Sequence, residues 1–186
     1  MKTEWIVIAA VLAVAGYVIA MFNRLVRTRN LVREGWSGID VQLRRRSDLV
    51  PNLVETVKAY AAHERNLFED ITTRRSSTLT AGAVPQKAAA EQALQGSLGR
   101  LMAVAEAYPQ LKADRNFLKL QEQLADIEDQ LQMARRYYNG TVRDFNIRIQ
   151  SFPDILLARM LGYREEHFFQ IDAASAAVPS ISLSRA

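Results

Sequence analysis

A long uncharged apolar run near the N-terminus constrains this chain more than any other feature. The run extends from Trp5 to Phe22 and contains 18 residues without a charged or strongly polar side chain. As an α-helix it would be about 27 Å long, close to the roughly 30 Å hydrocarbon core of a bilayer. The run therefore predicts a transmembrane helix, with Trp5 at the level of the lipid headgroups.

Arginines on the C-terminal side of the run indicate how this helix would lie in the membrane. Arg24, Arg27 and Arg29 follow the run directly, whereas Lys2 on the other side is offset by Glu4. Because short segments rich in Lys and Arg stay in the cytoplasm, we expect an external N-terminus and a cytoplasmic body. The three arginines are also predicted to contact lipid headgroups, since each cation near an anionic surface contributes about 1 kcal/mol.

A cleaved signal peptide is the alternative interpretation of the same segment. Residues 13–15 (Ala-Val-Ala) have the small-x-small pattern of a cleavage site and follow a short apolar core. However, the apolar run continues to Phe22, and the excess of positive charge lies on the wrong side. We therefore favour a retained anchor, whereas cleavage would place the rest of the chain outside the cytoplasm.

Small residues recur along the run at helical spacing. Ala9, Ala13, Gly16 and Ala20 are separated by four, three and four positions and so share one helix face. Small side chains at such a face allow two membrane helices to approach closely, and the pattern predicts self-association there. Alanine is also common in membrane helices without this role.

Composition restricts what the rest of the chain can do. The 186 residues carry a net charge of +4, but seven arginines between residues 24 and 46 account for the basic excess. Residues 47–186 carry 16 basic against 17 acidic groups, so they lack the basic surface typical of nucleic-acid-binding domains. Cysteine is absent, which excludes disulfides, thiolate metal sites and a lipid-modified cysteine.

Beyond residue 24 the apolar residues repeat with the period of an α-helix, and no strand-like alternation persists. We expect the first helix to leave the membrane and to bend or break near Pro51, because proline disfavours helical geometry at the preceding residue. A second helix is expected to end near Ser76, before a loop over residues 76–85. A third is expected over about residues 86–107. Its predicted inward-facing residues are Leu94, Leu98, Leu101 and Ala105.

The longest periodic segment begins at Phe117. Steps of three and four residues connect an apolar seam of more than four heptads: Phe117, Leu120, Leu124, Ile127, Leu131, Ala134, Tyr138, Thr141 and Phe145. The next step falls on Arg148, so the seam ends one position out of register, at Ile149. Such a seam needs partner helices of comparable length, either from the same chain as an antiparallel bundle or from another chain. We expect the helix to end at residues 152–153 (Phe-Pro), before a short helix capped by Gly162.

The chain contains no convincing catalytic or metal-binding set. His63 and Glu64 begin the H-E-x-x-H pattern of zinc hydrolases, but Leu67 occupies the position of the second histidine. The acidic residues between 122 and 129 lack the Glu-x-x-His pattern of carboxylate metal sites. We therefore predict no enzymatic activity, no metal, no cofactor and no nucleic-acid ligand.

A second group of basic residues lies farther from the membrane run. The candidate contacts for a protein partner are Trp36, Arg44, Arg45 and Arg46. On a straight helix Arg44 would lie roughly 33 Å beyond the run, too far to interact with headgroups at physiological ionic strength. The arginines would then bind an acidic partner or pair with Asp40 and Asp48, and we favour the intramolecular pairs. Trp36 either packs in the core or anchors a partner, and core packing is favoured.

Three stretches of the chain resemble the signature of the LemA family. They are LVRTRNLVREGWSGIDVQLRRRSDLVPNLVETVKAYAAHE from residue 25, EAYPQLKADRNFLKLQEQL from residue 106 and ARRYYNGTVRDFNIRIQSFPDILLARMLGY from residue 134. They follow one register over about three quarters of the chain. The C-terminal residues VPSISL also resemble the family's short final segment.

The resemblance implies a bacterial, membrane-anchored, antiparallel helical bundle with no established catalytic activity. Some members of the family are associated with magnetosome membranes, which implies a role in membrane organisation. Other members begin with a lipoprotein cysteine and would lie outside the cytoplasm, but this chain has no cysteine. The implied location is the inner membrane of a bacterial cell.

The sequence thus predicts an all-α, single-pass membrane protein. Its expected parts are a transmembrane anchor over residues 1–23, an antiparallel bundle of about four long helices over residues 24–163 and an extended tail over residues 164–186. We expect a non-enzymatic scaffold that self-associates and organises the membrane or its proteins. The alternative is an adaptor or accessory subunit of a membrane enzyme or transporter, docking through Arg44–Arg46 and the tail. The expected partners are membrane lipids, further copies of the chain and a membrane protein.

Overall fold

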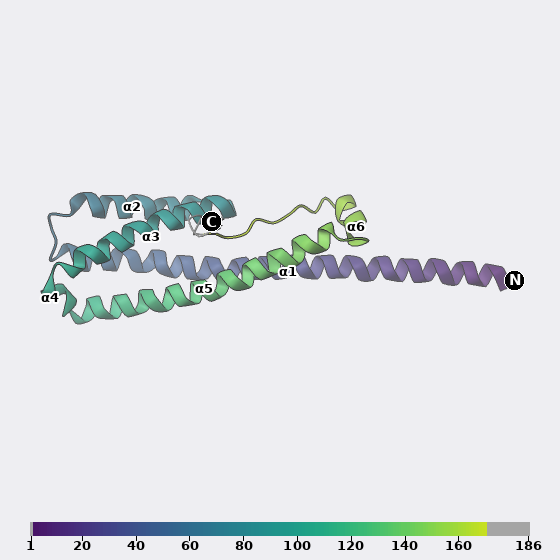
Figure 1. Ribbon diagram of the computed structural model, residues 1–186, viewed down its shortest axis with the longest axis horizontal. Coiled ribbons are helices and arrows are strands. Elements are labelled where there is room, and N and C mark those ends of the chain that lie inside the picture. The colour runs from purple at the N-terminus through teal and green to yellow at the C-terminus, as the bar shows by residue number, and fades with distance from the viewer. Residues whose placement is uncertain (1, 171–186) are drawn as a thin grey trace, which may run out of the picture. The chain divides into compact units, whose positions relative to one another are not determined.

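The computed structural model describes residues 2–170, and its regular secondary structure there is entirely α-helical (Figure 1). The helices are α1 (Lys2–Lys58), α2 (Arg65–Thr80), α3 (Val84–Glu106), α4 (Pro109–Lys112), α5 (Arg115–Gln150) and α6 (Asp154–Met160). The predicted all-α class is confirmed. Contacts divide the described chain into a first unit, residues 2–42 and 129–168, and a second unit, residues 43–128 with 169–170. The predicted domain boundaries at residues 23 and 163 stay predictions, and α1 passes through residue 23 without interruption.

In the second unit, segments of four long helices share one hydrophobic core. Its members include Val50, Leu53 and Val57 from α1, Phe68 and Ile71 from α2, Leu94, Leu98, Leu101 and Ala105 from α3, and Phe117 from α5. The residues predicted to face inward from the third helix are all buried, so this prediction is confirmed. Short connections make successive helices alternate in direction, and α2 and α3 lie side by side (Figure 1).

Pro51 lies inside α1, so the predicted break at this residue is wrong. The helix continues to Lys58, and α2 begins only at Arg65. Proline has no N–H to bond the carbonyl of Ser47, one turn earlier. The Nε–H of Arg75, on α2, donates to that carbonyl oxygen at 2.7 Å instead. A neighbouring helix thus supplies the donor that the proline removes.

The predicted loop over residues 76–85 is also largely wrong. α2 continues to Thr80 and α3 begins at Val84, so only residues 81–83 connect them. The hydroxyls of Ser77 and Thr80 donate to backbone carbonyls one turn earlier in the helix. Such back-bonding satisfies polar side chains within a helix, which a composition rich in Ser and Thr does not reveal.

In the first unit, α1 and the C-terminal half of α5 approach closely and run antiparallel. A Cβ atom on Gly35 would lie 3.0 Å from the Cα of Tyr138, and one on Gly38 would lie 3.9 Å from the Cβ of Ala134. Numbers that rise along α1 therefore meet numbers that fall along α5. Only a residue without a side chain allows the two backbones to come so close at position 35.

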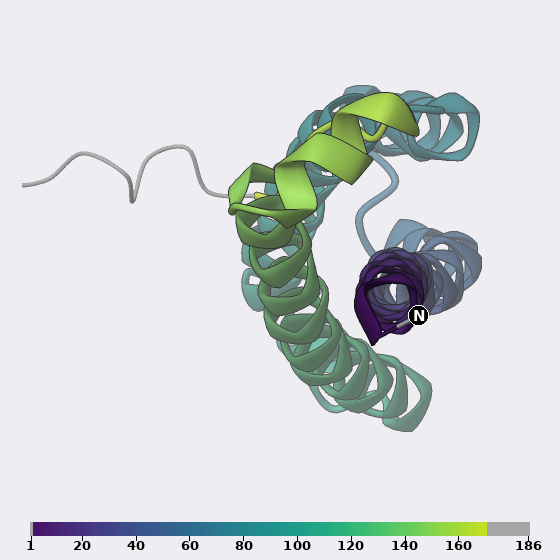
Figure 2. The same ribbon diagram turned by 90° about the vertical axis from the view of Figure 1, so that its right-hand side faces the viewer.

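The seam predicted on the fourth long helix is confirmed on α5. Every seam residue from Phe117 to Phe145 is buried or half-buried, and Ile149 is more buried than Arg148. The short helix α6 turns away from the end of α5 (Figure 2). Gly162, with a φ of 69°, ends it, and the N–H of Tyr163 donates to the carbonyl of Ala158 at 3.0 Å, as in a glycine C-cap. Most of the predicted tail, residues 171–186, lies outside the described residues.

Candidate membrane anchor and partner surfaces

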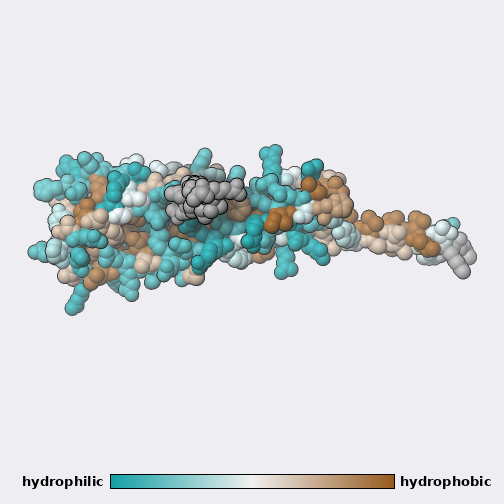
Figure 3. All heavy atoms as spheres, viewed as in Figure 1, coloured by the Kyte–Doolittle hydropathy of each residue, from teal (hydrophilic) through white to brown (hydrophobic). Residues whose placement is uncertain are grey.

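The apolar N-terminal part of α1 is exposed on all its faces. Every residue from Thr3 to Ala20 is exposed, and Figure 3 shows hydrophobic residues along this part of the helix. Within residues 2–170, α1 is the one helix long and apolar enough to cross a membrane. A core helix of a soluble protein would be mostly buried. Apolar surface costs about 25 cal/mol per Å² in water, a cost that a hydrocarbon surrounding removes.

The small-residue face predicted for self-association lies within this exposed segment. Ala9, Ala13, Gly16 and Ala20 are all exposed. A Cβ atom on Gly16 would meet no atom within 4 Å. The face is therefore accessible to lipid or to a second helix.

The three arginines predicted to contact headgroups have different surroundings. Arg24 and Arg27 are exposed, whereas Arg29 is half-buried. The guanidinium carbon of Arg29 lies 5.1 Å from the centroid of the Tyr163 ring, a cation–π contact. Tyr163 also meets the ring of Phe145 edge-on, with centroids 5.9 Å apart. Arg29 thus ties the segment after α6 to α1, and Arg24 and Arg27 are the exposed cations nearest the anchor.

An extended segment, residues 163–168 and termed the strap, runs back along α5. The hydroxyl of Tyr138 donates to the carbonyl of His167 at 2.8 Å. The side-chain amide of Asn146 donates to the carbonyl of Glu166 and accepts from its N–H, both at 2.9 Å. Burial, with a smaller effect from the charge of Glu166, raises the pKa of Tyr138 to about 12, which keeps the phenol protonated as a donor.

From the sequence, residues 164–168 of the strap were assigned to the tail and Tyr163 to the end of the bundle, and none of these contacts was predicted. The available signal was Asn146, a polar residue that directly follows Phe145 in an apolar seam. Its backbone partner lies 20 residues farther along the chain. A buried amide side chain needs hydrogen-bond partners, but its own sequence neighbourhood does not identify them.

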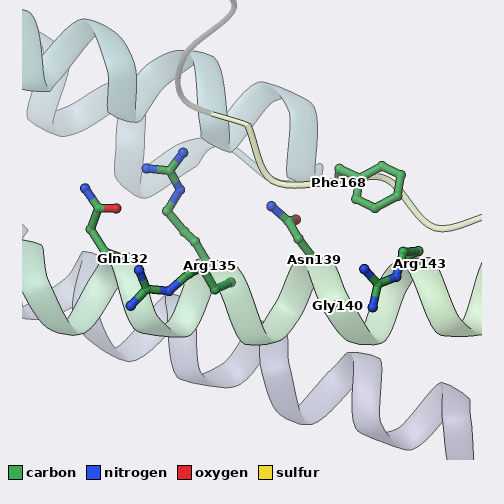
Figure 4. Close-up of a pocket in the computed structure, with 7 residues that line it drawn as sticks. Gln132, Arg135, Asn139, Gly140, Arg143 and Phe168 are labelled. Atoms are coloured by element: carbon green, nitrogen blue, oxygen red, sulfur yellow. The ribbon is translucent and has the colours of Figure 1, made fainter. Parts of the chain in front are cut away.

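A positively charged pocket of about 490 Å³ lies on α5 beside the strap (Figure 4). Its lining residues are Gln132, Arg135, Arg136, Asn139, Gly140, Arg143 and Phe168. Arg135 and Asn139 point from α5 toward the strap side, where Phe168 forms part of the wall (Figure 4). Three arginines and no acidic residue line the pocket, and Arg143 pairs with Asp144 next to it at 3.3 Å, so the pocket suits a carboxylate or a phosphate group mainly at its other two arginines.

Arg46 is fully buried, so its prediction as an exposed partner contact is wrong. Its guanidinium donates to a carboxylate oxygen of Glu91, on α3, and to Glu128 Oε1, on α5, at 2.8 Å. The favoured intramolecular pairing holds for Arg46, but its partners are Glu91 and Glu128 instead of Asp40 or Asp48. Burial alone would lower the pKa of Arg46, yet the two carboxylates raise it above its ordinary value. Arg46 is therefore a cation in the core of the second unit.

The other predicted partner contacts are divided between surface and interior. Arg44 and Arg45 are exposed. Trp36 is half-buried, and its ring centroid lies 5.6 Å from that of Tyr138. Trp36 thus packs on an aromatic neighbour within the first unit and stays partly exposed, so its role as a partner contact remains a prediction.

A polar cluster joins α2 to α3 at Asp70. Its carboxylate accepts from Arg74 Nε at 2.7 Å, from Ser97 Oγ at 2.7 Å and from Arg100. The Ser97 hydrogen bond first, and then the two arginines, lower the pKa of Asp70. His63 lies apart from this cluster and is exposed. Among residues 2–170, no three His, Cys, Asp or Glu residues are grouped as metal ligands would be.

The sequence of this chain is similar to a family model and to several known proteins. Residues 35–183 match the model described as the LemA family. The match begins at Gly35, where α1 and α5 approach closely. The chain is 25% identical over 194 residues to magnetosome protein MamQ 1 of Paramagnetospirillum magneticum, covering 89% of this chain and 71% of that protein. It is 26% identical over 159 residues to magnetosome protein MamQ of Magnetospirillum gryphiswaldense, with 72% and 58% covered. It is 26% identical over 150 residues to protein LemA of Metamycoplasma hominis, with 80% and 68% covered.

Proposed function

The chain belongs to the LemA family, and on that premise we propose that it is a single-pass, non-enzymatic scaffold at the inner membrane of a bacterial cell. The observation that carries the proposal is the continuity of α1. One uninterrupted helix is exposed from Thr3 to Ala20 and apolar from Trp5 to Phe22, and its first buried residues are Met21 and Leu25. Because α1 has no break between this segment and the first unit, a continuous helix and not a loop joins the two.

The relatives support a place at a membrane. Two of them are magnetosome proteins, and a magnetosome is a membrane-bounded compartment. The exposed Arg24 and Arg27 support a cytoplasmic body, because cations next to a membrane helix favour the cytoplasmic side. In this orientation both guanidinium groups face the anionic headgroups of the inner leaflet.

Self-association through the membrane helix gives the scaffold its means of organising other molecules. In a bilayer, lipid satisfies apolar side chains as well as another helix does, so association depends on close packing. The accessible face of Ala9, Ala13, Gly16 and Ala20 has the small side chains that such packing needs. Each added copy would carry a further helical body to the same membrane site.

The test is the detergent-corrected mass of the full-length chain, measured by light scattering after gentle extraction from native membranes. We expect a defined oligomer for the wild type and a monomer for the Ala13→Leu/Gly16→Leu variant, because larger side chains separate the helices. Val11→Leu/Val18→Leu, on the opposite face, is the matched control and keeps the oligomer. A monomeric wild type, or an oligomer that survives Ala13→Leu/Gly16→Leu, contradicts this mechanism.

An adaptor for a membrane enzyme or transporter is the second candidate function. The arginine-lined pocket on α5 favours it, since Arg135, Arg136 and Arg143 suit an acidic partner. The exposed Arg44 and Arg45 could contribute, whereas the buried Arg46 does not. Deletion of residues 173–186 separates the two functions. Loss of a co-purifying protein with intact self-association supports the adaptor, and unchanged co-purification contradicts docking through the tail.

A further inference from the structure

We propose that the corner between α5 and α6 inserts into the interface of the membrane leaflet from which α1 emerges. The inference rests on the membrane anchoring proposed above and adds a second lipid contact to it. We term this surface the apolar corner, and it consists of Phe152, Leu156, Met160 and Leu161. The partner of this surface is lipid, from the same bilayer that α1 is proposed to span.

The apolar corner consists of exposed large apolar side chains that lie within ten residues of one another in the sequence. Phe152 is 82% exposed and Met160 is 84% exposed, and Leu156 and Leu161 are also exposed. Leu156 and Met160 are four residues apart on α6 and therefore share one side of it, and Phe152 lies in the turn directly before the helix. Ala158 is buried, so α6 has an inner and an outer side. Scattered apolar residues are normal on a surface, but a cluster of large ones marks a contact site.

The register between α1 and α5 brings the apolar corner to the end of the membrane helix. Gly35 faces Tyr138 in this antiparallel pair. Twelve residues beyond Tyr138 is Gln150, the last residue of α5, and twelve residues before Gly35 is Asn23. Both helices rise about 1.5 Å per residue, so equal counts bring the two positions level. The turn and α6 then follow, beside the residues that end the predicted span at Phe22.

The burial of α1 changes at the same level. Residues 3–20 are exposed without exception, and the first buried residues are Met21 and Leu25. In Figure 1, α6 lies at the level along α1 beyond which α1 extends alone toward the N-terminus. The apolar corner is therefore the part of the first unit that comes next to the bilayer when Trp5–Phe22 spans it.

Charged residues around the apolar corner fit an interfacial position. Arg159 is exposed on α6, and Arg24 and Arg27 are exposed on α1 at the end of the span. Asp154, the acidic residue of α6, lies 3.9 Å from a guanidinium nitrogen of Arg148, which offsets its charge. Interfacial segments place large apolar side chains in the acyl boundary and basic residues among the headgroups. With two points in one leaflet, the first unit could not rotate freely about the axis of α1.

The absence of native cysteine allows a direct test with single-cysteine variants of the full-length chain. Met160→Cys carries an environment-sensitive fluorophore at the apolar corner. Met133→Cys is the matched control, since Met133 is also an exposed methionine of the first unit. It precedes Tyr138 by five residues and so lies level with Asp40, about 27 Å beyond Phe22. Ile19→Cys reports on the membrane helix itself.

Each labelled protein is reconstituted into vesicles of phosphatidylethanolamine and phosphatidylglycerol that contain lipids with a nitroxide near the headgroup. We expect the nitroxide lipid to quench the Met160→Cys label roughly twofold or more beyond the Met133→Cys label, because only the former reaches the interface. Equal quenching at the two positions overturns the proposal. So does a blue-shifted Met160→Cys label that the lipid does not quench, since a protein surface then covers it.

The Ile19→Cys label separates this proposal from the anchor. Quenching of Ile19→Cys by lipids with a deep nitroxide, without quenching of Met160→Cys, overturns the apolar corner alone. If Ile19→Cys is accessible to an aqueous quencher and not to the lipid quencher, the membrane anchor itself is wrong. Leu156→Cys repeats the measurement at a second position and guards against a local effect of one label.

Discussion

The side chain of Arg46 places a guanidinium group in the mostly apolar core of the second unit. Arg46 is 0% exposed and Glu91 is 1% exposed, so this pair is formed away from water. Burying a charge is costly unless an opposite charge and hydrogen bonds compensate for it. The network joins α1, α3 and α5 at one point and therefore favours one register among the three helices.

Removing only the arginine should destabilise the second unit strongly. Arg46→Met leaves Glu91 buried without its partner and should lower the free energy of unfolding by about 3–5 kcal/mol. Arg46→Met/Glu91→Leu should recover most of that loss, since both buried charges are then gone. Urea unfolding of the full chain in micelles, followed by circular dichroism, gives these values.

Arg45→Met is the control at the neighbouring position. Arg45 is exposed, and an exposed ion pair contributes at most about 1 kcal/mol. Equal losses for Arg45→Met and Arg46→Met would contradict the role of Arg46.

Gly35 and Gly38 offer a matched pair on one helix. A Cβ at Gly35 meets the backbone of Tyr138 at 3.0 Å, whereas a Cβ at Gly38 has ordinary contact at 3.9 Å. Gly35→Ala should destabilise the first unit by about 1–3 kcal/mol, because α5 must move to admit the methyl group. Gly38→Ala should stabilise it by about 0.5–1 kcal/mol through helix propensity. The same urea measurement decides, and a stabilising Gly35→Ala would contradict the close approach.

The buried phenol of Tyr138 should give the first unit an alkaline limit. The fold raises its pKa from an ordinary value near 10 to about 12, because burial favours the neutral form. This stabilisation is complete below about pH 10 and is lost as the pH rises toward about 12. Between those values the wild type should lose more stability than Tyr138→Phe, which has no proton to release. Parallel losses in the two proteins would show that Tyr138 is not the group that titrates.

At the scale of the helices, the spacing of apolar residues correctly predicted which helix faces are buried. The seam of α5 and the inward face of α3 follow from apolar residues at helical spacing, and both are buried as predicted. The same rules were wrong at Pro51 and over residues 76–85, where helix continues. In the first case the missing donor comes from Arg75, which lies 28 residues away from the carbonyl that it bonds. Partners so distant in sequence are invisible to local rules.

Among the site residues, too, features that depend on local sequence were predicted, and contacts between residues distant in sequence were not. The exposed apolar segment of α1 was predictable, because a long uncharged apolar run is visible in the sequence alone. The burial of Arg46 was not, since neither Glu91 nor Glu128 is near it in sequence. The strap was missed for the same reason, because the partner of Asn146 lies 20 residues farther along the chain.

A double-mutant cycle tests the compensation at Pro51. In the wild type, Arg75→Ala leaves the carbonyl of Ser47 without its donor and should cost about 1.5–3 kcal/mol. Pro51→Ala restores an N–H that can bond this carbonyl, so Arg75→Ala should cost much less in that background. A coupling free energy near zero in the urea measurement would contradict the exchange of donors.

At the scale of the whole molecule, α1 connects two environments. Its N-terminal part is the candidate membrane helix, and the rest of its length contributes buried residues to both helical units. Assembly of copies in the membrane would therefore bring the first units of those copies together, since α1 enters this unit without an intervening loop. The seam residues of α5 are buried or half-buried within the described chain, so the proposed self-association is assigned to the apolar segment of α1 and not to this seam.

The most direct test of the membrane anchor is extraction of the full-length chain from bacterial membranes with alkaline carbonate. The wild type should stay with the membrane pellet. Leu12→Asp/Val14→Asp should be released, because each carboxylate near the centre of the span costs about 2.5–3.5 kcal/mol. Leu12→Ile/Val14→Ile keeps the segment apolar and should be retained. Release of the wild-type chain into the supernatant would contradict the account.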